Sequence, residues 1–148
     1  MFTVVAEPRA AFRQAFGARL RADARLMSVI TGVFGQLSEA ARVDLPYLVF
    51  GPQRLDRSAG AMGLAGANVT LELDGWSAYK GPAQMEDILS RVSALMEREP
   101  LPIVGFEMVV GSLTCELSEL YDEPDEDMPD GRLWRGHQRW MAEVHDAR

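Results

Sequence analysis

The chain has 148 residues, of which 47% are hydrophobic and 25% are charged, and its formal net charge at pH 7 is −7. This composition is typical of a folded globular protein and excludes an intrinsically disordered one. The acidic balance argues against a general nucleic-acid binder, which would carry a basic patch. Because this length supports one hydrophobic core and no linker-like segment interrupts it, we expect residues 1–148 to form one domain.

Targeting signals and disulfides are not expected. The N-terminal stretch MFTVVAEPRAAF has neither the basic region nor the long apolar region of a secretory signal. No run approaches the roughly 18–20 apolar residues that span a membrane. Cys115 is the only cysteine, which excludes an internal disulfide and a thiol-based metal cluster. We therefore expect a protein that is made and folded in the cytoplasm and does not bind a membrane.

Residues 8–22 have the periodicity of an amphipathic helix. Phe12, Phe16 and Leu20 recur at i, i+4 and i+8 on one face, and Pro8 suits the first turn. Phenylalanine stripes of this kind belong to a core far more often than to a ligand pocket. Arginines cover much of the remaining surface at Arg9, Arg13, Arg19 and Arg21.

Asp23 is placed to cap a second, short helix with Leu26 and Ile30 turned inward. Residues 31–44 are glycine-containing and predict a loop, with a short extended piece at 33–34.

The apolar run LPYLVFG at 45–51 predicts a strand covered on both faces, with Pro46 at its start because proline has no donor for the ladder. The following stretch, GPQRLDRSAGAMGLAGA at 51–67, contains four glycines and predicts a flexible loop. It resembles no phosphate-binding loop, since no Lys-Ser/Thr ending is present. If this loop has a function, ordering on contact with a neighbour is the natural one.

Residues 68–77 alternate cleanly, with Val69, Leu71 and Leu73 inward, and predict the clearest strand. Residues 82–99 predict the clearest helix, which the prolines at 100 and 102 end. Its apolar stripe comprises Met85, Ile88, Leu89, Val92, Leu95 and Met96. A short strand is expected around 108–110.

Residues 113–144 predict a strand, an acidic loop and a return strand. In the first strand the alternation turns Leu113, Cys115 and Leu117 inward, so we expect Cys115 to be a small core residue. The return strand turns inward Trp134, Gly136, Gln138, Trp140, Ala142 and Val144. Between the strands, six carboxylates fall within nine residues, and isolated buried carboxylates cost several kcal/mol each, so the loop must face solvent or a partner.

Together these elements predict an α+β fold. Two main helices pack on a mostly antiparallel sheet of four or five strands, and long loops project from it.

Enzyme chemistry finds little support in the sequence. The candidate groups are Cys115, His137 and His145, but no serine has a nucleophile-elbow context and no HExxH or CxxC occurs. His137 lies among arginines, which would favour its neutral form, and His145 lies near the end of the chain. The acidic run lacks the glycine and final glutamate of a calcium loop. We expect no catalytic residue, no cofactor and no specific metal site.

The sequence resembles the small phage-type tail-completion proteins, in particular the version carried by alphaproteobacterial gene transfer agents, over about residues 10–144. The resemblance rests on the segments LRADARL, LPYLVFG, VTLELDGWS and DEPDEDMPDGRLWRGHQRW, and within them on Pro46-Tyr47, Trp76-Ser77 and the return from Asp130-Gly131 to Gly136.

That resemblance implies a structural protein and not an enzyme. It implies a ring of copies, usually six, that ends tail-tube growth and joins the tube to the head–tail connector, or stopper, while DNA passes through the lumen without specific binding. The expected location is the cytoplasm during assembly and then the tail of the particle. The candidate contacts with a neighbouring copy or partner are Arg54, Arg57, Met62, Leu64, Asp122, Glu123, Asp125, Glu126, Asp127, Arg132 and Arg135.

An alternative from a different class stays open on the sequence. A small acidic α+β binding module or enzyme would use a groove between the helix at 82–99 and the sheet.

Overall fold

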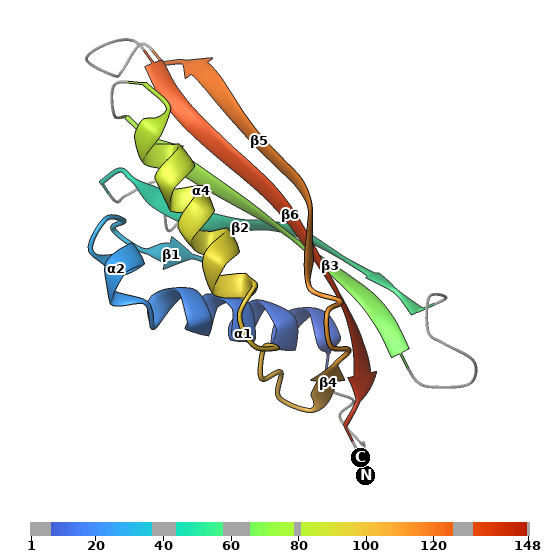
Figure 1. Cartoon of the computed structure of the whole chain (residues 1–148). Coiled ribbons are helices and arrows are strands. Elements are labelled where there is room, and N and C mark those ends of the chain that lie inside the picture. Colours follow the sequence, from blue (N-terminus) through green and yellow to red (C-terminus); the bar gives the residue numbers. More distant parts are fainter. Residues whose placement is uncertain (1–6, 37–43, 58–65, 79–80, 126–131, 148) are drawn as a thin grey trace.

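A computed structural model describes residues 7–36, 44–57, 66–78, 81–125 and 132–147. They form a six-stranded sheet with its helices on one face (Figure 1). The elements are α1 (Pro8–Arg21), α2 (Ala24–Met27), β1 (Val33–Phe34), β2 (Tyr47–Asp56), β3 (Gly66–Ser77), α4 (Ala83–Met96), β4 (Phe106–Met108), β5 (Thr114–Pro124) and β6 (Arg132–Asp146).

The sheet has the order β1-β2-β3-β6-β4, and β5 also pairs with β6. Strands β3 and β6 form the antiparallel centre, paired from Gly66 opposite His145 to Ser77 opposite Trp134. Strands β5 and β4 occupy successive stretches of the other edge of β6. The predicted α+β class is confirmed, although the sheet is mixed, because β1 runs parallel to β2.

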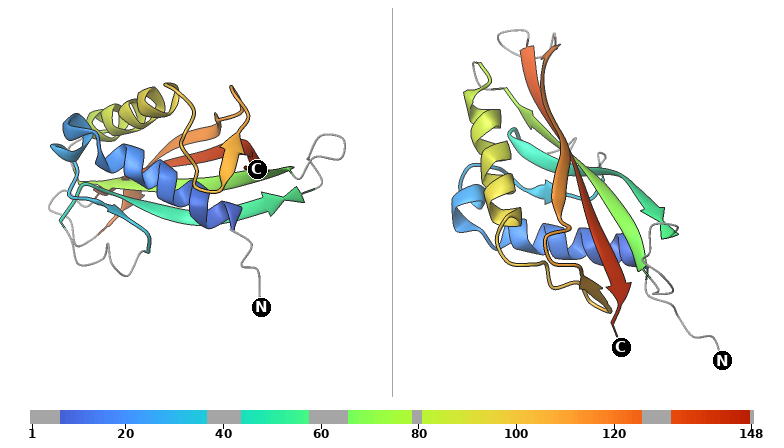
Figure 2. Two further views of the ribbon diagram at one scale, coloured as in Figure 1. Left: turned by 90° about the horizontal axis from the view of Figure 1, so that it is seen from below. Right: turned by 45° about the vertical axis from the view of Figure 1, so that its right-hand side comes forward.

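The two long helices cover the same face of the sheet, as the left view of Figure 2 shows. The predicted stripes of α1 and α4 are the buried ones, and they meet the inward residues of β3 and β6 in one core. Leu71, Leu73, Ile88, Val92 and Leu95 are all at most 2% exposed and belong to this core, which confirms the assigned register. Among the described residues, no helix is long and apolar enough to cross a membrane.

Strand β2 is longer than predicted. It continues through Gln53 to Asp56 instead of ending at Gly51, so the first part of the expected loop is strand. A register shift between Phe50 and Gln53 hides this in the sequence, because it resets the alternation at Gly51-Pro52. The rest of that expected loop, 58–65, lies outside the described residues.

Strand β4 comprises Phe106–Met108 and not the predicted 108–110. Glycines with positive φ, Gly105 at 84° and Gly111 at 79°, fix turns on either side of it. Phe106 is therefore the buried residue, while Val110 is 81% exposed.

The prediction that Cys115 is a core residue is wrong, because its side chain is exposed. Strand β5 is an edge strand, and a register shift between Cys115 and Leu117 interrupts the alternation on which the prediction depended. Cys115→Ser should therefore change the free energy of unfolding by no more than about 0.5 kcal/mol, as is usual for surface substitutions. Chemical denaturation of the two proteins checks this, and a loss of several kcal/mol would show that the thiol is packed after all.

Asp23 caps α2 as predicted, and it also holds α4. Its carboxylate accepts the backbone N–H of Leu26 at 2.9 Å and two bonds from Arg91, at 2.8 Å from Nε and 2.6 Å from Nη2. These bonds, chiefly those from Arg91, hold the pKa of Asp23 at about 2, below its usual value. The short helix and the long helix are thereby tied together.

Asp23→Ala should lower the free energy of unfolding by about 0.5–2 kcal/mol, because the cap is lost. A carboxyl group with a depressed folded-state pKa stabilises the fold above its unfolded pKa, and that stability is lost as protons bind. In the wild type the contribution should therefore fall between about pH 4 and pH 2. Urea unfolding of the wild type and the variant across this pH range measures the difference between their free energies of unfolding. A difference that does not change with pH would contradict the hydrogen bonds between Asp23 and Arg91.

Candidate assembly surfaces

The predicted contact residues lie at opposite ends of the sheet. Arg54 and Arg57 are exposed at the end of β2, beside the stretch of β3 that pairs with the C-terminal part of β6. Asp122 and Arg132 lie where β5 and β6 approach their connection (Figure 1). The structure thus separates the candidates into two surfaces instead of gathering them into one. The candidates Met62, Leu64, Glu126 and Asp127 lie outside the described residues.

The acidic half of the hairpin is partly neutralised within the chain. Asp122 forms an ion pair with Arg132 of the return strand. Arg135 lies between two carboxylates, with Nη2 3.0 Å from Asp74 Oδ1 and Nη1 3.6 Å from Glu123 Oε1. Exposed pairs of this kind contribute about 0–1 kcal/mol each. Arginines of β6 therefore offset part of the negative charge of β5.

Arg135 is also stacked between aromatic rings on the face of the sheet that the helices leave open. Its guanidinium carbon lies 5.5 Å from the ring centre of Trp76 and 5.8 Å from that of Tyr121. Such contacts contribute about 0.5–1 kcal/mol at exposed sites. They fix the arginine in place across three strands, since Trp76 and Tyr121 come from β3 and β5.

His137 lies in acidic surroundings and not in the arginine-dominated ones expected from its sequence neighbours. Its Nδ1 is 2.8 Å from Asp74 Oδ1, and its Nε2 is 3.3 Å from Glu72 Oε1. The alternation of β3 alone predicts that Glu72 and Asp74 share one face of the sheet. That His137 lies beside them follows only from the pairing of β3 with β6.

No catalytic constellation is formed by the described residues. His145 Nε2 lies 3.7 Å from Glu143 Oε1, and Cys115 Sγ contacts the backbone oxygen of Leu117. Neither histidine is hydrogen-bonded to a serine or to the thiol in the described part of the chain. The same residues contain no group of three or more acidic, histidine or cysteine side chains that could hold a metal ion.

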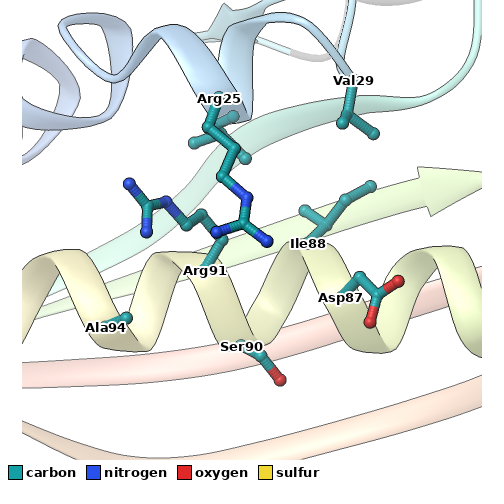
Figure 3. A pocket seen from close by; sticks show the side chains of 8 residues that line it. Arg25, Val29, Asp87, Ile88, Ser90, Arg91 and Ala94 are labelled. Carbon is teal, nitrogen blue, oxygen red and sulfur yellow. The ribbon is translucent and has the colours of Figure 1, made fainter.

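A pocket of about 420 Å³ lies between α2 and α4. Figure 3 shows its wall, with Arg25 and Val29 on one side and Asp87 and Ile88 on α4. Arg91, which also lines it, is committed to Asp23. Its lining contains no histidine or cysteine.

A second groove, of about 540 Å³, lies between α4 and β5, where the sequence-based alternative placed a ligand. Gln138 of β6 forms part of its lining and is 1% exposed. Its amide donates to Ser93 Oγ and Ser118 Oγ, both at 3.3 Å, while its oxygen accepts the Trp140 indole N–H at 3.0 Å. This network was not predicted. It satisfies a buried amide and ties the hairpin to α4.

The chain matches one family model, and its fold is similar to those of solved structures. A model described as tail completion protein gp17 matches residues 14–144. A chain of the solved structure entitled "Virion of native gene transfer agent (GTA) particle" superposes with a TM-score of 0.73 at 18% identity, over 95% of this chain and 99% of that chain. The gp17 protein of bacteriophage SPP1 superposes with a TM-score of 0.54 at 20% identity, over 94% and 91%. No curated protein matches the sequence. At these identities the two structures establish a shared fold.

Proposed function

Since this chain belongs to the family of tail completion protein gp17, whose members are structural proteins of phage tails and not enzymes, we propose that it forms a closed ring of six copies. The ring ends the tail tube and joins it to the head–tail connector, and DNA passes through its lumen. The match over residues 14–144 carries this proposal.

The shape and charge of the subunit support it. A ring built by rotation needs two different surfaces on each copy, one for each neighbour. The candidate contacts occupy two separate ends of one sheet. The part of β2 beyond its pairing with β1 and the edge strand β5 lie on opposite sides of that sheet. A net charge of −7 also suits a passage that DNA must slide through, because like charge disfavours binding.

The proposal is tested by the mass of the purified protein, alone and mixed with the tail-tube protein of the same particle. A species of about six times 16.4 kDa, alone or at tube ends, is expected. A protein that stays monomeric under both conditions and does not bind tubes would overturn the proposal.

The acidic connection of the hairpin should act in joining and not in subunit stability. Neutralising it with Asp125→Asn, Glu126→Gln and Asp127→Asn should leave the thermal midpoint nearly unchanged or slightly raised, because carboxylates this close in the sequence repel one another. Binding to tubes or connector at low salt should weaken, and co-sedimentation at two salt concentrations measures this. Unchanged binding at both would mean that the segment is merely solvated.

A further inference from the structure

The groove between α4 and β5 is lined by acidic and apolar side chains. Its acidic side chains are Glu86 of α4 and Glu97 at the C-terminal cap of α4, and its lining contains no arginine or lysine. Leu89 and Leu120 supply the apolar part of the lining. Beside the groove, β5 is an edge strand: among the described residues only β6 pairs with it. This surface therefore offers negative charge, some apolar area and a row of backbone hydrogen-bonding groups.

The opposite edge of the sheet is rich in arginine. Gln53 of β2 joins it to α1, since its Nε2 donates to the backbone oxygen of Arg9 at 2.8 Å and its Oε1 accepts from Arg13 Nη1 at 3.0 Å. Arg54 and Arg57 are exposed at the end of the same strand. The pKa of Glu7 is lowered chiefly by hydrogen bonds from Arg9, with a smaller contribution from Arg57, so the start of α1 and the end of β2 form one surface.

We infer that these two surfaces meet between adjacent copies of this chain. The α4–β5 groove of one copy receives the α1–β2 edge of the next copy, with arginines of the edge facing glutamates of the groove. The arginines are Arg13, Arg54 and Arg57, and the glutamates are Glu86 and Glu97. The inference rests on the proposed ring and names the contact that closes it.

Two features support this pairing of surfaces. First, β2 and β5 lie on opposite sides of the central β3–β6 pair, so the contact is head-to-tail and can repeat by rotation. Second, the surfaces have opposite charge, which steers association and disfavours the wrong pairing of two grooves or two arginine edges. The large hydrophobic side chains that are exposed in the described part of the chain lie outside both surfaces, except for Tyr121 on the open face of β5. Charge therefore sets the partner and the orientation.

Charge reversal separates this inference from its alternatives. The acid-reversed variant carries Glu86→Lys and Glu97→Lys. The base-reversed variant carries Arg54→Glu and Arg57→Glu. A third chain carries all four substitutions. A matched control changes two other exposed carboxylates by the same charge, with Glu99→Lys and Glu107→Lys.

Native mass spectrometry, with tube protein added where the wild type needs it, should show the ring for the wild type and the control. Each reversed variant alone should be monomeric, with an unchanged thermal midpoint, because both of its surfaces then carry the same sign. The ring should return when the two variants are mixed and in the chain with all four changes. Only a specific contact between these surfaces predicts that recovery.

A wild-type ring that both variants retain would overturn this inference and leave the proposed ring standing. Folded variants that lose the ring and recover it neither on mixing nor in the chain with all four changes would also overturn it. A wild type that forms no ring under either condition would overturn the proposed function, and this inference with it.

Discussion

Phe16→Ala should destabilise the subunit by about 3–5 kcal/mol, the usual cost of removing a fully buried phenylalanine. Phe16 is 0% exposed, and its ring packs edge-on against three others at centroid distances of 5.7–6.2 Å. The partners are Phe12 of α1, Phe50 of β2 and Trp140 of β6. The side chain therefore joins α1 to two strands that are not neighbours in the sheet.

Guanidinium unfolding of wild type and variant measures this loss. Tyr121→Ala is the matched control, because this aromatic side chain is 39% exposed and its stacking on Arg135 contributes about 0.5–1 kcal/mol. A loss below about 1 kcal/mol for Phe16→Ala, or equal losses for both changes, would mean that α1 is not held to the sheet at this point.

Gly136→Val should cost about 1–3 kcal/mol or more, because it inserts a branched side chain where α4 lies against the sheet. A Cβ atom at this position would lie 2.8 Å from Met85 Cγ and 2.9 Å from Leu89 Cδ1. The residue opposite on β3 is Gly75, where a Cβ atom would lie 2.7 Å from Met85 Sδ. The two glycines together form the surface on which the first turns of α4 rest.

The matched control is Gly35→Val, since no atom lies within 4 Å of a Cβ atom built there. Its effect on the unfolding midpoint should be small. The loss from Gly136→Val should shrink when Met85→Ala is added to make room, so the two changes together should cost less than the sum of their separate costs. Strict additivity would show that α4 does not rest on this glycine.

The helices and the central strands were predictable because their patterns are local. The spacing of Phe12, Phe16 and Leu20, and of the stripe in α4, specifies a buried face without any knowledge of its partner. The alternation of β3 and β6 does the same for the sheet. Where a register shift resets the alternation, as in β2 after Phe50 and in β5 after Cys115, the same rule fails.

The partners of the polar side chains could not be predicted from local patterns. Asp23 signals its own cap, but Arg91 lies 68 residues further along the chain. The carboxylates on either side of His137 come from β3, and the arginines that pair with the acidic strand come from the return strand, so each pair depends on strand register. The two oppositely charged surfaces follow from strand order, which brings α1 to β2 and α4 to β5.

The central claim, that this protein completes a phage-type tail as a ring, is tested most directly by electron cryomicroscopy of the tail-tube protein assembled with and without it. The account predicts one ring of six copies at one end of each tube, with subunit density that fits the sheet and its two helices, and uncontrolled tube lengths when the protein is omitted. Copies spaced along the tube wall, or tube ends and lengths that do not depend on the protein, would contradict it.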